Sequence, residues 1–204
     1  DDVESRGLGD VYKRQDEEYI NSLLSVLEAN LSYIPSSTAK KELTDISLYD
    51  HVKMTAAIAS CVEQYLEEQQ EKDYKKCLFT EAQESYKKEM FLLYSMDVSG
   101  IQNFIYTVGE KGALKGLRAR SFYLEIMMEH MVDELLEKLF LSRANLIYTG
   151  GGHCYMLLSN TQKTRNVIEQ YEKETNQWLM DHFDTALYVC LLYTSPSPRD
   201  STSS

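Results

Sequence analysis

The sequence predicts an α+β fold, in which a helical segment precedes a domain with the element order β-α-β-β-α-β. Apolar residues recur at helical spacing through 16–31 and again through 47–70. Beyond residue 88, short apolar runs alternate with long helical stripes, and a run of three glycines separates two of the short runs. We therefore divide the chain into a helical segment, a connector and a mixed domain, at residues 16–75, 76–88 and 89–189.

Composition places the chain among globular proteins. It has 204 residues, of which 43% are hydrophobic and 11% aromatic, enough to build one ordinary domain or two small ones. The formal charge of −11 argues against a protein that coats nucleic acid, since such proteins need a basic surface. No apolar run is long enough to cross a bilayer, so we expect no membrane partner. The four cysteines form no Cys-x-x-Cys pair, which disfavours a zinc knuckle and favours a reducing, cytoplasmic location.

The two ends of the chain are unlike its middle. Residues 1–15 have no apolar periodicity, and residues 190–204 are rich in Ser and Pro. Both resemble translated sequencing-adapter sequence, and a native disordered terminus is the alternative. We leave both segments out of the fold prediction and expect the chain to be truncated on both sides.

The helical segment contains one candidate metal-binding pair. A break at 35–38 separates its two helices, and Asp45 or Ser47 is a suitable N-cap for the second. Asp50 and His51 follow at the start of that helix. Adjacent carboxylate and imidazole side chains hold divalent metals in phosphohydrolases. The alternative is a helix cap next to a surface histidine.

The mixed domain is predicted to be ferredoxin-like, because its elements follow the β-α-β-β-α-β order. Strands are expected over 90–96, 144–148, 153–158 and 185–189. A helix is expected after Gly100, a loop over 109–116, a long helix over 117–141, and another helix capped by Asn160 or Thr161.

Palm domains of polymerases and nucleotide cyclases use this layout, with a carboxylate at the end of the first strand facing an acidic turn between the middle strands. Those carboxylates bind a metal pair. Asp97 occupies the first position, where it is also placed to cap a helix beginning near Ser99. The turn instead reads Gly150-Gly151-Gly152-His153. We therefore do not expect a complete two-metal site.

The same turn and a basic cluster are candidates for nucleotide contact. Glycines allow backbone amides to approach phosphate, although a plain hairpin turn also uses them. His153 contacts either a nucleotide or its neighbours in the strand. Lys111, Lys115, Arg118 and Arg120 form a basic cluster suited to phosphate or RNA, and a helix-flanking surface patch is the alternative.

Several motifs carry a resemblance over residues 16–189. Ile34–Thr38 and Asp45–Ala59 resemble the end of the HD nuclease domain in the large subunit of type III (Csm-type, III-A) CRISPR effector complexes. Asp97–Ile105, Leu114–Leu124 and Tyr148–His153 resemble the first palm domain of the same family, in the same order and at similar spacing.

The resemblance implies a role in antiviral defence. The parent protein would cleave single-stranded DNA in its HD domain with a divalent metal such as Mg or Mn, and its paired palms would convert ATP to cyclic oligoadenylate. Its partners would be the other effector subunits, with guide and target RNA contacted indirectly. This chain would be inactive alone, since it has no upstream His-Asp pair and no acidic turn. It would supply the half of the ATP site without metal, facing a second palm of the parent, through Asp97, Ser99, Gly100, Gly150, Gly151, Gly152 and His153.

Other functions fit the same topology. A stand-alone cyclase of the diguanylate type predicts an acidic hairpin turn, which the sequence does not have. An RNA-binding module of the RRM type predicts stacking aromatics on the middle strands, where only Tyr148 and Tyr155 qualify. A structural ferredoxin-like module without catalysis is a further alternative.

Overall fold

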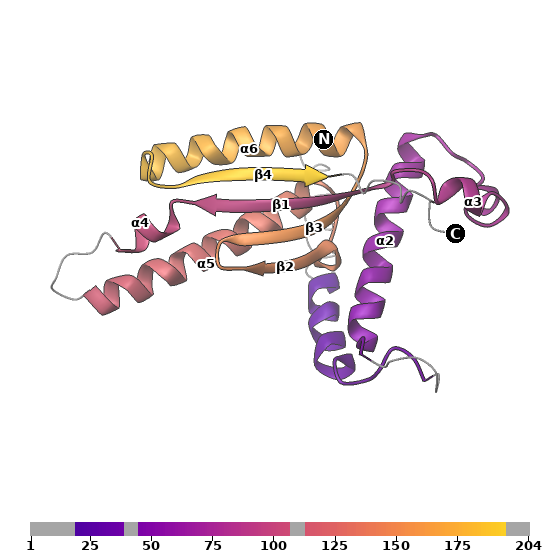
Figure 1. The fold of residues 1–204 in the computed structure, drawn as a ribbon, viewed down its shortest axis with the longest axis horizontal. Coiled ribbons are helices and arrows are strands. Elements are labelled where there is room, and N and C mark those ends of the chain that lie inside the picture. Colours follow the sequence, from indigo (N-terminus) through magenta and orange to yellow (C-terminus); the bar gives the residue numbers. More distant parts are fainter. Residues whose placement is uncertain (1–18, 39–44, 107–112, 195–204) are drawn as a thin grey trace, which may run out of the picture.

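The computed structural model describes residues 19–38, 45–106 and 113–194, and it confirms the α+β fold (Figure 1). The chain is helical over 19–31, and the remaining elements are α2 (Leu48–Glu68), a π-helical turn (Lys76–Thr80), α3 (Ala82–Ser85), β1 (Phe91–Ser99), α4 (Ile101–Tyr106), α5 (Ala113–Lys138), a 3-10 turn (Arg143–Asn145), β2 (Leu146–Gly150), β3 (His153–Ser159), α6 (Gln162–Phe183) and β4 (Tyr188–Thr194).

The four strands form one antiparallel sheet in the order β2-β3-β1-β4, which is the ferredoxin-like arrangement. Alternate residues of β1, from Leu92 to Val98, are buried, as expected for a sheet with one covered face. The core cluster joins them to apolar residues of α5 and α6. The opposite face is more open, and Leu93 and Tyr155 on it are 44% and 42% exposed.

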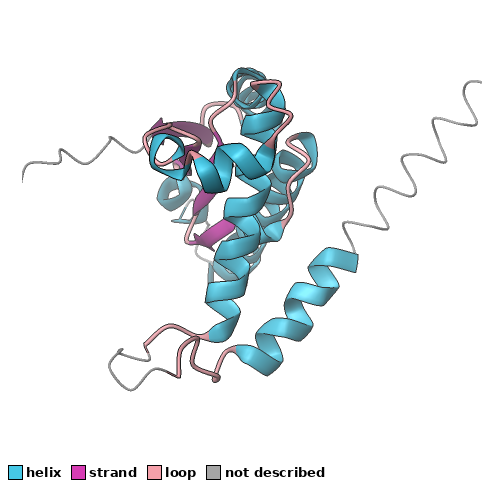
Figure 2. Cartoon of the chain, turned by 90° about the vertical axis from the view of Figure 1, so that its right-hand side faces the viewer, coloured by secondary structure: helices cyan, strands magenta, loops and turns pink. Residues whose placement is uncertain are grey.

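The first helix and α2 form a pair beside the sheet (Figure 2). A single bridge between Pro35 and Ser47 closes the connection between them. Ser47 is the N-cap of α2: its Oγ accepts from the backbone N of Asp50 (3.0 Å) and donates to Oδ2 of Asp50 (2.7 Å). These contacts select Ser47 over Asp45 as the cap.

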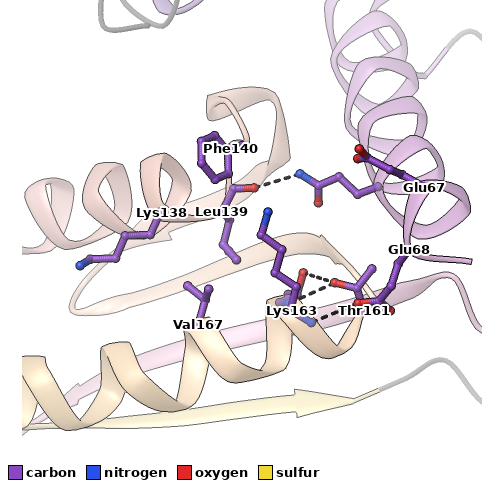
Figure 3. Close-up of a pocket in the computed structure, with 10 residues that line it drawn as sticks. Glu67, Glu68, Lys138, Leu139, Phe140, Thr161, Lys163 and Val167 are labelled. Carbon is purple, nitrogen blue, oxygen red and sulfur yellow. Dashed lines mark hydrogen bonds between the residues drawn. The ribbon is translucent and has the colours of Figure 1, made fainter. Parts of the chain in front are cut away.

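Helix α2 is bound to the mixed domain by polar contacts. Its Gln64 donates to the carbonyl of Leu139 (2.9 Å) and accepts from the hydroxyl of Ser159 (2.6 Å). Near its end, the carboxylate of Glu68 accepts from the backbone N–H groups of Gln162 (3.1 Å) and Lys163 (3.2 Å). Figure 3 shows Glu68 beside Lys163. Glu68 thus neutralises the N-terminus of α6, where unpaired N–H groups and the helix dipole favour an anion.

A buried side-chain amide also joins α2 to the mixed domain. Asn145 is 1% exposed and donates to the carbonyl of Leu157 on β3 (2.9 Å), with longer contacts to Ala57 and Cys61 on α2. A buried amide that is left unpaired is costly, so these contacts fix the position of α2 on the sheet. The helical segment and the mixed domain therefore pack as one unit, although the sequence suggested a connector between separate domains.

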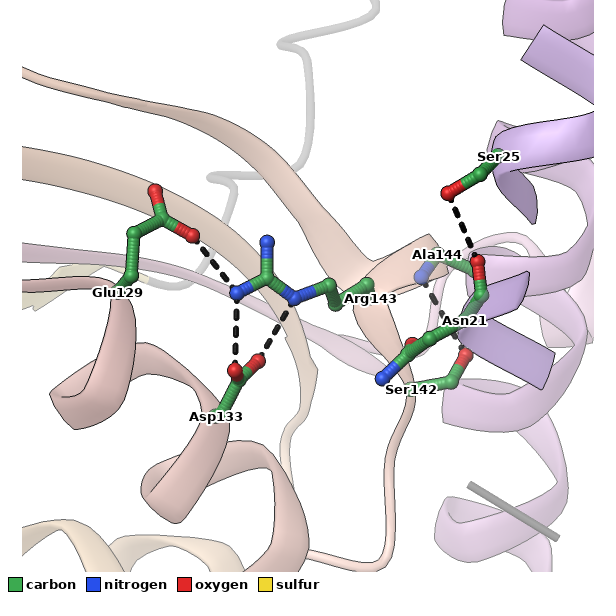
Figure 4. A network of polar contacts seen from close by, with 7 residues as sticks. All are labelled: Asn21, Ser25, Glu129, Asp133, Ser142, Arg143 and Ala144. Atoms are coloured by element: carbon green, nitrogen blue, oxygen red, sulfur yellow. Dashed lines mark hydrogen bonds and ion pairs between the residues drawn. The ribbon is translucent and has the colours of Figure 1, made fainter. Parts of the chain in front are cut away.

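Arg143 holds the entry to β2 against α5 (Figure 4). Its guanidinium donates to both oxygens of Asp133 (2.7 and 2.9 Å) and to Glu129 (2.7 Å). The hydrogen bond to Asp133, followed by that to Glu129, raises the pKa of Arg143 above its ordinary range. A fork of this kind fixes geometry as well as charge.

The connector is more structured than we expected. Within 76–88, the side chain of Cys77 is buried, and the hydroxyl of Ser85 donates to its carbonyl (2.7 Å). This local contact stabilises the π-helical turn and α3, so the segment is not simply a solvated linker.

Several expected boundaries differ from the structure. Strand β1 continues to Ser99, so Asp97 lies inside the strand and does not cap a helix. Helix α5 begins at Ala113, so residues 113–116 are helical and not loop. Strand β4 spans Tyr188–Thr194, not 185–189, because its ladder with β1 runs from Tyr188 opposite Ser99 to Thr194 opposite Leu93. The side-chain amide of Asn176 on α6 also pairs with the backbone of Val189 (2.7 and 2.9 Å).

The extension of β4 revises the expected end of the domain at residue 189. Residues 190–194 pair with β1 and belong to the sheet. The segments 1–15 and 195–204 lie outside the described residues. Among the helices of the described part of the chain, none has the length and hydropathy required to span a membrane.

Candidate functional site

The predicted site residues meet where β1 ends beside the β2–β3 hairpin. In the sheet register, Asp97 lies opposite His153 on β3, and His153 in turn lies opposite Gly150 on β2. A hollow of about 470 Å³ opens at this point, lined by Asp97, Val98, Gly100, Ile101, Gln102, Asn103, Gly151 and His153. The structure thus brings Asp97, Gly100, Gly151 and His153 to one cavity, with the other predicted glycines next to it.

Asp97 is held from two sides. Its Oδ1 lies 2.9 Å from Nδ1 of His153, and its Oδ2 accepts a hydrogen bond from the hydroxyl of Ser99 (3.2 Å). The side chains of Asp97 and His153 remain 38% and 52% exposed, so the pair borders solvent. Because Asp97 bonds to one ring nitrogen, the other nitrogen, Nε2, lies on the far side of the ring, available to a ligand.

The glycines have different roles. Gly100 has a φ of +89°, and a Cβ added there would lie 2.0 Å from the carbonyl oxygen of Ala186. Gly152 has a φ of +87°, and a Cβ added there would lie 2.1 Å from Cδ1 of Ile101. Gly100 is therefore required by close backbone packing, whereas at Gly152 the obstacle is the tip of a side chain and the positive φ is the main reason for glycine. Gly151 has φ of +61°, and nothing lies within 4 Å of its Cβ position. It is the glycine of the turn that leaves open space beside the cavity.

The basic cluster is only partly available to a ligand. Lys115 and Arg118 are exposed on the first turns of α5. Arg120 instead donates to the carbonyl of Phe104 and lies over its ring, 5.1 Å from the centroid. Arg120 therefore joins α5 to α4. Lys111 lies outside the described residues.

The cavity does not fit a metal pair. Asp97 is the carboxylate that faces it, and both of its oxygens already have protein partners. Among residues 19–38, 45–106 and 113–194, no three His, Cys, Asp or Glu side chains gather where they would hold a metal ion. At the start of α2, the carboxylate of Asp50 accepts a hydrogen bond from the hydroxyl of the N-cap Ser47, and His51 is exposed. Their assignment as metal ligands stays a prediction.

Two side chains in the cavity were not singled out from the sequence. Gln102 and Asn103 line it from the first turn of α4, directly after the turn at Gly100. Both lie within the motif Asp97–Ile105, so the signal was their place after a strand and a glycine. Their amides add hydrogen-bonding groups to a lining that already includes Asp97 and His153.

A family profile described as "Csm1 subunit domain B" matches residues 90–204. The chain is 51% identical over 173 residues to the CRISPR system single-strand-specific deoxyribonuclease Cas10/Csm1 (subtype III-A) of Mycobacterium tuberculosis, covering 85% of this chain and 21% of that protein. It is 50% identical over 181 residues to the protein of the same description from Streptococcus thermophilus, covering 89% and 24%. The chain thus spans about a fifth to a quarter of these relatives.

Solved structures agree. Csm1 of T. onnurineus superposes with a TM-score of 0.68 at 36% identity, covering 85% of this chain and 22% of that one. A Csm1–Csm4 cassette in complex with AMPPNP gives a TM-score of 0.71 at 36% identity, covering 86% and 22%. With the family profile, the relatives and the fold in agreement, the chain belongs to the Cas10/Csm1 family of subtype III-A CRISPR systems, as a fragment that includes domain B.

Proposed function

We propose that the chain forms part of the large subunit of a type III-A CRISPR effector complex and supplies the half of its ATP site that holds no metal. The observation that carries the proposal is the cavity at the end of β1, where Asp97, Gly151 and His153 meet beside open space. Csm1–Csm4 structures with AMPPNP and with cA4 support a nucleotide as its ligand.

The parent protein would act in antiviral defence in the cytoplasm. The names of the relatives support cleavage of single-stranded DNA, and the nucleotide-bound structures support conversion of ATP to cyclic oligoadenylate. Asp50 and His51 would then be a remnant of the nuclease site, completed by Mg or Mn and by ligands from elsewhere in the parent. Such a metal would lower the pKa of a bound water to generate the nucleophile.

The open face of the sheet supports a second palm of the parent as a partner. By register, Tyr148, Tyr155, Ser95 and Leu192 form one row across the sheet, next to the row that contains Asp97 and His153. Three of them are large side chains, with 52%, 42% and 71% exposure for Tyr148, Tyr155 and Leu192. A covering domain would bury this surface and bring its own residues to the nucleotide. Csm4, other effector subunits, and guide and target RNA would lie beyond it.

Titration of the 204-residue chain with ATP, followed by backbone amide NMR, tests the proposal. Half a site should bind in the millimolar range, about −4 kcal/mol. We expect the largest shifts at Gly100, Gly151 and His153. Asn tolerates positive φ, so Gly151→Asn should keep the fold but place a side chain at the cavity and weaken binding about tenfold. Lys173→Gln, on the exposed side of α6, is the matched control.

Shifts confined to other regions, or no saturable shift at 10 mM ATP (roughly ten times the expected Kd), would refute the proposed site. Binding that Gly151→Asn and Lys173→Gln reduce equally would also count against it.

One observation favours RNA binding as a second candidate. The rings of Tyr148 and Tyr155 lie 6.2 Å apart at 38° to each other on the open face, and exposed aromatics on a sheet stack on unpaired bases. Fluorescence anisotropy with single-stranded RNA tests this alternative. Tyr155→Leu should then abolish RNA binding and leave ATP binding unchanged.

A further inference from the structure

A groove of about 370 Å³ lies between α5 and α6, apart from the cavity at the end of β1. The two helices run antiparallel, because Tyr123 of α5 lies next to Phe183 of α6 (5.9 Å between ring centroids). At the other end of α5, Lys138 contacts Glu174. Three of the side chains that line the groove are buried in the core: Met127, Met131 and Tyr171. Both helices pack on the covered face of the sheet, so the groove and the open face lie on different sides of the domain.

One cation of the chain already lies at the end of this groove. Nζ of Lys138 is 5.9 Å from the centroid of the Tyr171 ring. It is also 3.8 Å from the carboxylate of Glu134 and 3.3 Å from that of Glu174. An aromatic face and carboxylates together attract an ammonium or guanidinium group. Because Lys138 offsets only one of the two negative charges, the groove keeps an attraction for a further cation.

Both carboxylates are held in place by neighbouring donors. The hydroxyl of Tyr171 donates to Oε2 of Glu134 (3.2 Å). The amide of Gln170 donates to Oε1 of Glu174 (2.7 Å). The hydrogen bond from Gln170, followed by that from Lys138, lowers the pKa of Glu174. The negative charge is therefore preorganised before a ligand arrives.

Trp178 adds an aromatic surface next to these carboxylates. It follows Glu174 by one helical turn, lines the groove together with His130, and is 40% exposed. One turn further along, His182 stacks on one face of the indole (4.5 Å between ring centroids, 26° between planes). The opposite face of the indole is therefore the one left to the groove.

We propose that the groove docks an arginine-bearing segment of a partner subunit, with the guanidinium held between Trp178, Glu134 and Glu174. A guanidinium fits better than an ammonium, since it is planar, stacks on an indole and forks to carboxylates. A protein segment fits better than a free polyamine, because Tyr123 and Ile126, one turn from lining residues of α5, are 44% and 52% exposed and a neighbouring chain would bury them.

The second palm is proposed for the open face of the sheet, so another subunit of the complex is left for the side that carries the groove. The identity of this partner rests on the proposed function, whereas the chemistry of its segment does not.

The effector complex reconstituted with the parent subunit tests the docking. With p-benzoylphenylalanine in place of Trp178, ultraviolet light should cross-link the parent to one partner subunit, at a segment that mass spectrometry shows to contain an arginine. The same residue in place of Lys173, on another exposed side of α6, should give no such cross-link. Glu174→Lys should weaken association of that subunit by about tenfold or more, whereas Glu169→Lys should leave it unchanged. Glutamate in place of the partner's arginine should restore association with the Glu174→Lys variant.

An assembled complex in which position 178 cross-links to no partner subunit, or only to the parent chain or to RNA, would overturn the proposal. So would equal effects of Glu174→Lys and Glu169→Lys in variants whose circular dichroism spectra show that they fold.

A second arm uses the 204-residue chain alone. Trp178 is its single tryptophan, so the fluorescence of the chain reports on the groove directly. N-acetyl-arginine amide should change the emission more than N-acetyl-citrulline amide, which has nearly the same shape and no charge, and Glu134→Gln/Glu174→Gln should abolish the difference. Equal responses to the two compounds would overturn the assignment of arginine. If no complex assembles, the proposed function fails, while this arm decides the chemistry of the groove separately.

Discussion

Alanine at the glycines of the site should show how tightly the backbone is packed around it. Gly100, Gly151 and Gly152 all have positive φ, so alanine at each loses about 1 kcal/mol from backbone strain. They differ in what an added methyl group meets. At Gly151 it meets nothing within 4 Å, at Gly152 the tip of the Ile101 side chain at 2.1 Å, and at Gly100 the backbone oxygen of Ala186 at 2.0 Å.

The expected costs follow this order. Gly151→Ala should cost about 1 kcal/mol, the strain alone. Gly152→Ala should cost about 2 kcal/mol, because the Ile101 side chain can change rotamer. Gly100→Ala should cost about 4 kcal/mol, since the chain that leads into β4 must move. For a chain of this size, a loss of about 1 kcal/mol lowers the Tm by roughly 2–4 °C. Relative to the wild type, we therefore expect the Tm to fall by roughly 2–4 °C in Gly151→Ala, 4–8 °C in Gly152→Ala and 8–16 °C in Gly100→Ala.

Thermal unfolding followed by far-ultraviolet circular dichroism measures the series on the 204-residue chain. Gly151→Ala serves as the matched control for the conformational term. Equal losses of Tm at Gly100 and Gly151 would refute the reasoning, because they would mean that the Ala186 contact contributes nothing.

Three further predictions concern the rest of the chain. Burial raises the pKa of Cys154 from 9.0 to about 12, so its thiol should resist iodoacetamide at pH 8.5 (roughly half a unit below that ordinary value) while exposed Cys190 reacts, as read by mass spectrometry. Since this folded-state pKa lies above the unfolded one, the stability that burial of Cys154 contributes is fully present below pH 9.0 and is lost as pH rises towards 12; a flat urea midpoint over that range would contradict the shift. Glu68→Gln should cost about 1 kcal/mol by removing the anion at the start of α6, whereas Glu67→Gln should change little; chemical denaturation compares them, and equal effects would exclude the capping role. Arg143→Lys should cost about 1–2 kcal/mol in the same assay, because a lysine cannot reproduce the fork to its two carboxylates, and an unchanged midpoint would refute this.

Hydrophobic periodicity and turn residues are sufficient to predict most of the fold. Apolar alternation in β1, the helical stripes and the glycine turn are local properties, so the sequence predicts the β-α-β-β-α-β order. The cavity follows from the same reasoning, because a palm layout places the end of the first strand beside the hairpin. Asp97, Gly151 and His153 were predicted as parts of one site and do meet there.

Element ends were less predictable, since contacts between distant residues set them. The bounds of β4 follow its ladder with β1, and Asn176 of α6 bonds the backbone of Val189 near its start. No local sequence pattern near residue 188 indicates these contacts with distant residues. The prediction rested on strand propensity alone, and it therefore ended the strand at residue 189.

The sequence by itself determined the fold class, the order of the helices and strands in the mixed domain, and the placing of Asp97, Gly151 and His153 beside one another. Only the tertiary structure decided how they act together. It paired Asp97 with His153, assigned Arg120 to Phe104, and packed α2 on the sheet through Asn145 and Glu68. Such pairings join residues far apart in the chain, and their geometry is set by packing and strand register, which local propensity does not encode.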